Sequence, residues 1–113
     1  MRAAFYEKLG PAKDVLKVGE LPKPAPQAGE VLVRIHASGV NPSDVKMRLG
    51  TGSATNEFPQ IVPHSDGAGI IEAVGTGVPG ARIGERVWLW NGRWKRAFGT
   101  AAEYVALPAV QAV

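Results

Sequence analysis

Hydrophobic and polar residues alternate most clearly along residues 31–40, VLVRIHASGV. In an extended chain one face carries Val31, Val33, Ile35 and Ala37, and the other carries Leu32, Arg34, His36 and Ser38. An alternation with a period of two predicts a half-buried β-strand. His36 lies beside Arg34 on the more polar face, so we interpret it as a solvated histidine rather than a catalytic one.

Shorter hydrophobic runs in the rest of the chain are separated by glycine and proline. Fourteen glycines and nine prolines punctuate runs at residues 2–7, 16–21, 67–74, 86–90 and 101–107. Short runs bounded by turn-forming residues are typical of β-strands, and the dipeptide Asn91-Gly92 is a strong signal for a tight turn. The sequence therefore predicts a mostly β domain, folded as a partly open β-barrel.

One stretch, NPSDVKMRLG, has the signals of a short helix instead. Asn41 can cap its N-terminus, Pro42 suits the first helical position, and Asp44 complements the positive end of the helix dipole. Gly50 is a suitable stop, and the following residues 51–60 are predicted to form a loop. We expect one or two short helices in the domain.

The segment GTGVPG at residues 75–80 matches the glycine pattern of a dinucleotide-binding fold. In that fold a helix must follow the glycines. Pro79 and Gly80 are poor residues for an early helical turn, and the next predicted strand begins near Arg86. We therefore interpret the segment as a turn between two strands and expect no dinucleotide-binding fold within this chain.

Composition excludes several classes of protein. The 113 residues suffice for one domain and include no cysteine, which removes disulfides, thiolate zinc sites, iron–sulfur clusters and thiol nucleophiles. This composition fits a reducing compartment, so we expect a cytoplasmic protein. Residues 1–10 lack the apolar core of a signal peptide, and no stretch approaches the ~20 apolar residues of a membrane span.

The charge pattern gives little support for nucleic-acid binding. The net charge is +3, and the local basic cluster is Arg93, Lys95 and Arg96. A single cluster of this kind is more often a solvated loop than a nucleic-acid footprint. We therefore expect neither a nucleic acid nor a membrane as a partner.

Several ordered segments resemble a known family. They are EVLVRIHASGVNPSD, VPHSDGAGIIEAVGTGV, GERVW and GTAAEYVALP. They are similar to the N-terminal domain of the medium-chain dehydrogenase/reductase superfamily, and most similar to its zinc-independent NADPH:quinone oxidoreductase branch. The resemblance implies a GroES-like β-barrel over residues 1–113, with the active site in a cleft against a Rossmann domain. We therefore expect this chain to be a fragment that lacks the NADPH-binding domain. We expect the full-length protein to be a homodimer.

The resemblance also implies that both zinc sites of the superfamily are lost. Zinc-dependent relatives carry a cysteine where this chain has Asn41, and Gly-His-Glu where it has His64, Ser65 and Asp66. Ser65 therefore takes the place of the ligand histidine, and His64 lies one residue out of register. Amide and hydroxyl oxygens are poor zinc ligands, so we expect no metal and NADPH as the cofactor.

Site residues follow from the same resemblance. Asn41, with Pro42, is implied to contact the nicotinamide end of the cofactor, while the role of helix cap explains Asn41 equally well. Ser43 matches a hydroxyl that relays a proton in zinc-dependent relatives, and Ser65 can donate a hydrogen bond to cofactor or substrate. His64 can protonate the reduced quinone oxygen, although a packed or cleft-lining histidine is the favoured alternative.

Other residues near these have structural interpretations. For Asp44 a role at the helix dipole is favoured over catalysis, and for Asp66 we favour anchoring a turn at Gly67-Ala68-Gly69. Trp90 and Trp94 can offer a flat apolar wall to a planar ligand. Core packing is an equal or better interpretation of Trp90.

The leading hypothesis is the N-terminal catalytic domain of an oxidoreductase that transfers hydride from NADPH to a quinone or similar activated carbonyl without zinc. The isolated chain is then inactive, and the partner is a small quinone or enone. One alternative is a GroES-like binding or assembly module without catalysis. Another is an enoyl or alkenal reductase of the same superfamily.

Overall fold

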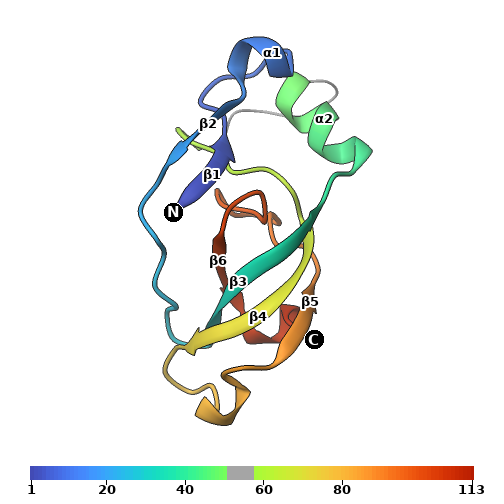
Figure 1. Ribbon diagram of the computed structural model, residues 1–113. Helices are drawn as coiled ribbons and strands as arrows, with labels where there is room; N and C mark the ends of the chain where they lie inside the picture. The colour runs from blue at the N-terminus through green and yellow to red at the C-terminus, as the bar shows by residue number, and fades with distance from the viewer. Residues whose placement is uncertain (51–57) are drawn as a thin grey trace.

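The computed structural model describes residues 1–50 and 58–113, so residues 51–57 of the expected loop lie outside the described residues. The elements in chain order are β1 (Arg2–Phe5), α1 (Ala12–Val15), β2 (Lys17–Glu20), β3 (Glu30–Gly39), α2 (Pro42–Leu49), β4 (Asp66–Val74), η1 (Gly80–Arg82), β5 (Arg86–Leu89), β6 (Tyr104–Pro108) and η2 (Ala109–Gln111) (Figure 1). Strands dominate this described part and its α-helices are short, which confirms the predicted class. The sheets stay open rather than closing into a barrel.

The larger sheet contains the main core. Its antiparallel strands are ordered β5-β4-β3-β6, so the long β3 lies between β4 and β6. Val33 of β3 pairs with Ile71 on one side and with Val105 on the other, and all three side chains are buried. Packed with them are Val31, Val87, Leu89 and Leu107. β-branched and leucine side chains therefore build this core, and Val31 and Val33 occupy it on the apolar face predicted for them.

The smaller sheet pairs β1 with β2, and the segment before β6 joins it to the larger sheet. Ala4 donates its backbone N–H to the carbonyl of Ala101 at 2.9 Å, and Ala3 forms an isolated bridge with Ala102. The strand predicted at residues 101–107 therefore begins only at Tyr104, because its first residues pair with the other sheet.

β3 contains an irregularity at His36 that the alternating pattern does not reveal. Its register with β4 shifts between Ile35 and Ala37, as in a β-bulge, and the alternation of faces restarts after the shift. His36 is exposed, as predicted. Ser38, predicted on the polar face with Arg34, instead hydrogen-bonds to the buried Thr100 at 2.9 Å.

The strand predicted at residues 67–74 is confirmed within β4, so the turn that Asp66 was expected to anchor at Gly67-Ala68-Gly69 is wrong. Their small size serves close strand pairing. A Cβ atom added to Gly69 would lie 2.0 Å from the backbone oxygen of Arg34, so a side chain cannot fit there. Asp66 accordingly anchors no turn, and its carboxylate accepts a hydrogen bond from Asn41 at 2.7 Å.

Helix α2 begins and ends where the capping signals predict. The carboxylate of Asp44 accepts the backbone N–H of Asn41 at 2.7 Å, which supports the structural role predicted for Asp44. Gly50 closes the helix in the left-handed conformation, with φ 75°. Because Asn41 also binds Asp66, the N-terminus of α2 is fastened to the start of β4.

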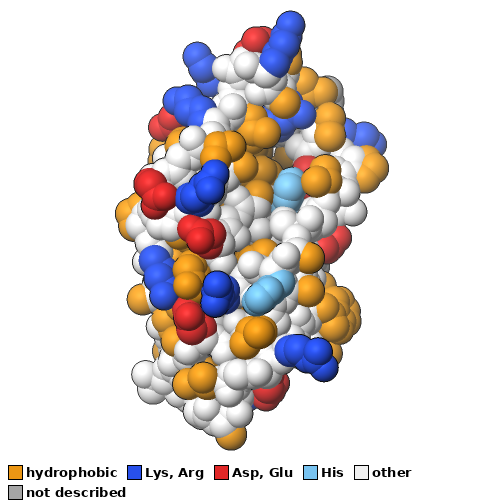
Figure 2. All heavy atoms as spheres, viewed as in Figure 1, with side chains coloured by type: hydrophobic (Ala, Val, Ile, Leu, Met, Phe, Trp, Pro, Cys, Tyr) orange, Lys and Arg blue, Asp and Glu red, His pale blue; other side chains and the backbone are white. Residues whose placement is uncertain are grey.

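The glycine-rich residues 75–80 lead from β4 into the 3₁₀ helix η1 and then into β5. β5 is the antiparallel neighbour of β4, and no α-helix follows the glycines, which confirms the interpretation as a turn. The described helices are all too short to cross a membrane. Charged side chains of both signs are interspersed over the face shown in Figure 2.

Candidate functional site

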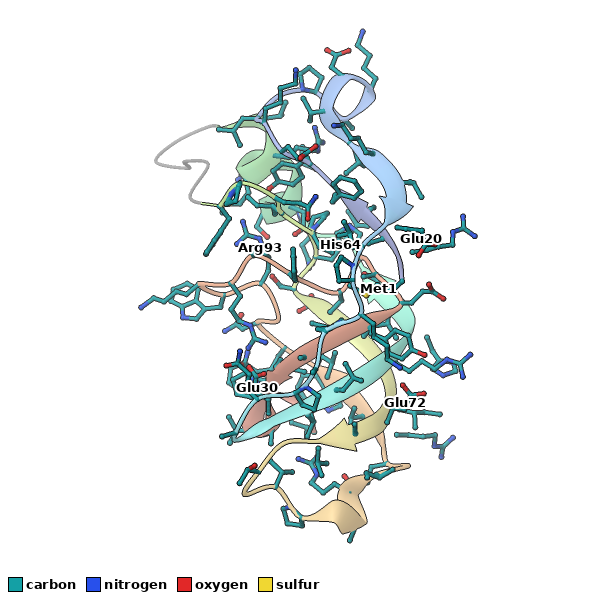
Figure 3. The ribbon with its side chains drawn as sticks, turned by 90° about the vertical axis from the view of Figure 1, so that its left-hand side faces the viewer. Met1, Glu20, Glu30, His64, Glu72 and Arg93 are labelled. Carbon is teal, nitrogen blue, oxygen red and sulfur yellow. The ribbon has the colours of Figure 1, made fainter. Side chains whose placement is uncertain are left out.

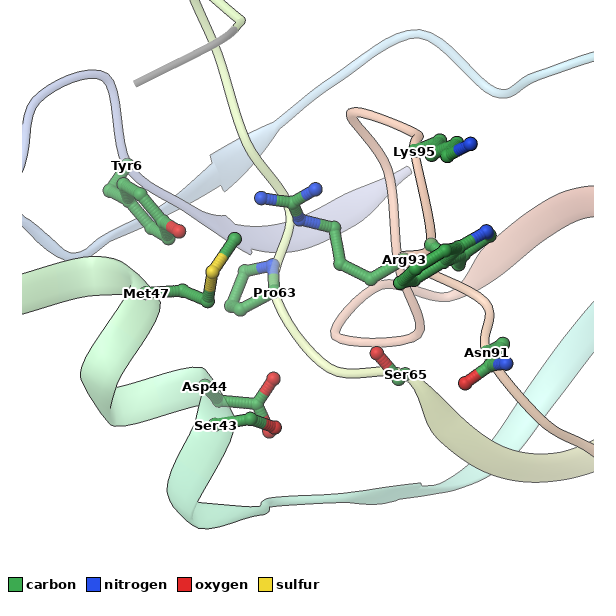
Figure 4. A pocket seen from close by; sticks show the side chains of 10 residues that line it. Tyr6, Ser43, Asp44, Met47, Pro63, Ser65, Asn91, Arg93 and Lys95 are labelled. Carbon is green, nitrogen blue, oxygen red and sulfur yellow. The ribbon is translucent and has the colours of Figure 1, made fainter. Parts of the chain in front are cut away.

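A pocket of about 490 Å³ opens beside α2 and between two loops. Polar side chains of Ser43, Asp44 and Ser65 and apolar side chains of Tyr6, Met47 and Pro63 line it (Figure 4). Ser43 and Asp44 come from the first turn of α2, whereas Pro63 and Ser65 precede β4. An apolar cavity with a few converging polar groups is the usual form of a small-molecule site.

The loop at residues 90–97 forms another wall of the pocket and projects sideways from the ribbon in Figure 3. It is fastened to the strand start by Gly92, whose N–H donates to the carbonyl of Ser65 at 2.8 Å. Asn91 adopts φ 49°, and its carbonyl accepts the Trp94 N–H at 3.0 Å, so the predicted turn at Asn91-Gly92 forms. The loop therefore positions its side chains against Ser65.

Arg96 holds the far end of this loop. Its guanidinium donates to the carbonyl of Ala106 and lies 3.8 Å from the carboxylate of Glu30. Burial lowers the pKa of Arg96, and the charge of Glu30 opposes this shift. Arg96 is therefore a structural cation that ties the loop to β3 and β6.

His64 connects the pocket loops through its backbone. It adopts φ 76°, which is unusual for a residue with a side chain. Its N–H donates to the carboxylate of Asp44 at 3.3 Å, and its carbonyl accepts the N–H of Thr100 at 2.9 Å. Gly99 packs directly against that carbonyl. His64 thus links α2 to the segment before β6.

The His64 ring takes part in a chain of hydrogen bonds whose direction follows from counting protons. Thr100 donates its hydroxyl proton to the carbonyl of Asp66 at 2.7 Å, so its oxygen accepts from Ser38 at 2.9 Å. Ser38 then has no second proton and must accept from Nδ1 of His64 at 2.7 Å. The imidazole therefore carries a proton on Nδ1.

Replacing Thr100 by valine is expected to lower the free energy of unfolding by about 2 kcal/mol, the cost of leaving buried polar groups without partners. Thr100 is fully buried, and valine keeps its shape but neither donates to Asp66 nor accepts from Ser38. Denaturant unfolding measures the difference. Thr100→Ser keeps the hydroxyl and is the matched control; an equal or larger loss in this variant would assign the effect to packing instead.

The structure brings some of the predicted site residues together and leaves others outside the pocket. Ser43 and Ser65 both line it. Asn41, Pro42 and His64 are not among its described lining residues. Pro42 is the first residue of α2, and the side-chain nitrogen of Asn41 donates to Asp66, so the capping position of Asn41 is structural.

The residues at the position that corresponds to the zinc site of zinc-dependent relatives do not fit a zinc ion. Within residues 1–50 and 58–113, no group of three or more His, Cys, Asp or Glu side chains converges. Asn41 is bound to Asp66, and the carboxylate of Asp44 accepts two backbone N–H groups. These oxygen donors lack the thiolate or imidazole companions that zinc prefers.

The tryptophans differ from the prediction in one respect. Trp90 is 39% exposed, so core packing is wrong for it, and it is not among the described lining residues of the pocket. Trp94 does line the pocket. Sequence reasoning missed Arg93 and Lys95 as lining residues because they were interpreted as a solvated cluster. The signal in the sequence that could have placed Arg93 and Lys95 at the pocket was their position directly after the Asn91-Gly92 turn.

Comparison with known proteins points to one family. A family model for the alcohol dehydrogenase GroES-like domain matches residues 27–113. The chain is 44% identical over 93 residues to a quinone oxidoreductase of Rattus norvegicus, covering 80% of this chain and 27% of that protein. It is 39% identical over 94 residues to an alcohol dehydrogenase of Geobacillus stearothermophilus, with the same coverage. The chain thus spans about a quarter of these relatives.

Solved structures agree with these relatives. The quinone oxidoreductase of Coxiella burnetii superposes with a TM-score of 0.88 at 29% identity, over 100% of this chain and 36% of that one. A mycobacterial protein complexed with NADPH superposes with a TM-score of 0.82 at 29% identity, over 100% of this chain and 33% of that one. The fold described above is therefore shared over its whole length.

Proposed function

The chain belongs to the alcohol dehydrogenase GroES-like domain family of the medium-chain dehydrogenase/reductase superfamily, and we propose that it forms the acceptor side of an oxidoreductase active site. The proposed reaction transfers hydride from NADPH to a quinone or a similar activated carbonyl. In this proposal residues 1–113 are the catalytic domain, and a further domain outside this chain binds the nucleotide.

The observation that carries the proposal is the pocket in which two hydroxyl groups meet an apolar wall. Ser43 from α2 and Ser65 from the strand start line one cavity with Met47 and Pro63. Apolar surface suits the flat ring of a quinone, and hydroxyl groups can stabilise the negative charge that develops on its oxygen. The quinone oxidoreductase relatives support the same acceptor class.

In this proposal the pocket holds the acceptor next to the nicotinamide ring, and it does not hold the rest of the cofactor. A nicotinamide cofactor, when bound, supplies the hydride, and a proton from solvent completes the hydroquinone. The pocket residues of this chain orient the acceptor. The glycine-rich residues 75–80 form a turn rather than a helix N-terminus, so this chain offers no pyrophosphate site of that type.

Roles for individual residues follow from their positions. We propose that Ser43 and Ser65 donate hydrogen bonds to the acceptor oxygen, and that Ser65 also contacts the nicotinamide. Asn41 and Pro42 lie at the N-terminus of α2, and we propose that they contact the nicotinamide end of the cofactor while the side-chain nitrogen of Asn41 binds Asp66. His64 positions the loops by its backbone, and its acid role is the weaker proposal.

We propose that the reaction proceeds without zinc. At the position that corresponds to the zinc site of zinc-dependent relatives, Asn41 is hydrogen-bonded to Asp66. In the complete protein, NADPH consumption with a 1,4-quinone is expected to continue unchanged after treatment with a strong chelator. Absorbance at the NADPH band measures this, with an enone as a second acceptor. Loss of turnover on metal removal would overturn the zinc-free mechanism, and no turnover with either acceptor would overturn the oxidoreductase itself.

A further inference from the structure

Two cationic side chains in the pocket wall have no acidic partner among the described residues. Arg93 and Lys95 line the pocket from the loop at residues 90–97. Within residues 1–50 and 58–113, neither takes part in an ion pair. Arg96, in the same loop, does contact a carboxylate, that of Glu30. The loop therefore uses one cation for structure and leaves two facing the cavity.

The contacts of these two cations hold them in place without neutralising them. Arg93 is half-buried, donates to the carbonyl of Arg96 at 2.6 Å, and lies 6.0 Å from the ring of Phe58. In Figure 4 its side chain extends over Pro63. The ammonium of Lys95 lies 5.5 Å from the ring of Trp94. Carbonyl and aromatic contacts position a guanidinium or ammonium and preserve its positive charge.

The carboxylate that lines the pocket already accepts hydrogen bonds from two backbone N–H groups. Asp44 is the only acidic residue among the described lining residues. One of its oxygens accepts the N–H of Asn41 at 2.7 Å, and the other accepts the N–H of His64 at 3.3 Å. These bonds satisfy Asp44 at the helix N-terminus, where its charge is stabilised. The loop side of the pocket is therefore left with a net positive charge.

We propose that the pocket selects acceptors in which a planar conjugated carbonyl carries an anionic group, a carboxylate or a sulfonate. The inference rests on the proposed function and names its substrate class. Arg93 and Lys95 bind the anion, the former through paired N–H donors. The exposed face of Trp94 lies between them in sequence and contacts the ring. The carbonyl then points toward Ser43 and Ser65.

The experiment compares two acceptors in the complete protein, a neutral 1,4-naphthoquinone and the same quinone bearing a sulfonate. The variant Arg93→Gln with Lys95→Gln removes both charges and keeps polar, unbranched side chains. Arg86→Gln is the matched control, because Arg86 is an exposed cation on β5 outside the described lining of the pocket. Initial rates give kcat/KM for each acceptor, and equilibrium titration without NADPH gives the Kd of the sulfonate.

We expect the double variant to lower the ratio of kcat/KM, sulfonate over neutral, by roughly tenfold, and to weaken sulfonate binding equally. The wild-type preference should shrink as salt is raised, while Arg86→Gln leaves the ratio unchanged. An unchanged ratio in a protein that still reduces the neutral quinone would overturn this inference and leave the proposed function standing. A raised KM for NADPH alone would overturn it too, by assigning the cations to a cofactor phosphate.

Discussion

Replacing Gly99 by alanine is expected to lower the free energy of unfolding by about 3 kcal/mol, the upper range for overpacking. A Cβ atom at this position would lie 1.9 Å from the carbonyl oxygen of His64 and 2.7 Å from that of Pro63. Both are backbone atoms, which cannot turn aside as a side chain would. Denaturant unfolding with a linear extrapolation measures the loss.

The position before β6 makes this substitution costly for the pocket as well. The carbonyl of His64 accepts the N–H of Thr100, so moving it disturbs the bond that joins His64, next to Ser65, to the segment before β6. Gly80→Ala is the matched control, because a Cβ atom there meets nothing within 4 Å. Alanine at position 80 should stabilise by about 0.5 kcal/mol through the unfolded chain. Similar losses at both positions would contradict the steric argument.

Removing both pocket hydroxyls, Ser43→Ala with Ser65→Ala, is expected to lower kcat for quinone reduction by roughly 100-fold. The loss of one such donor can reach this size in a closed site. This pocket is open to water that can replace part of a lost hydrogen bond, so each single variant should lose roughly tenfold. Steady-state rates of NADPH consumption in the complete protein measure both effects.

The threonine variants provide the control for these serines. Ser43→Thr and Ser65→Thr keep the hydroxyl, so they should retain most of the kcat that the alanine variants lose. A rise in KM with unchanged kcat would mean that the hydroxyls bind substrate and transition state equally. That result would contradict their role at the developing oxyanion. Unfolding curves identify any variant whose loss reflects a weakened fold.

Local signals predicted the elements that local chemistry controls. Helix α2 has its cap at Asn41, proline at its first position and its stop at Gly50, and all three interactions lie within one short segment. The core strand at Val31 and Val33 was equally visible, because alternation depends on neighbouring residues. The one-turn helix α1 was missed, since four residues are too short to show a helical period.

Features that depend on distant partners escaped prediction. The shift at His36 changes which face carries Ser38, and only the pairing with β4 reveals it. The strand at residues 67–74 was predicted, but the backbone of Arg34 that presses against Gly69 was not, because it comes from a distant segment. Core packing was an equal or better interpretation of Trp90 than a ligand wall, yet Trp90 follows the end of β5 and is exposed.

The candidate site shows the same division. Ser43 and Ser65 were identified from their positions in motifs, and the structure places both on one cavity. Arg93 and Lys95 were interpreted as a solvated cluster, because charge runs on loops usually are. Their place on the pocket wall depends on the hydrogen bond from Gly92 to Ser65, a contact between segments 27 residues apart.

The left-handed backbone at His64 makes this residue a point where conformational preference and side-chain chemistry oppose each other. Glycine would adopt φ 76° without steric cost and would relax the chain there. It would also remove the ring that donates to Ser38. The strain of the left-handed backbone and the hydrogen bond of the ring to Ser38 therefore oppose each other in the free energy of unfolding at this one residue.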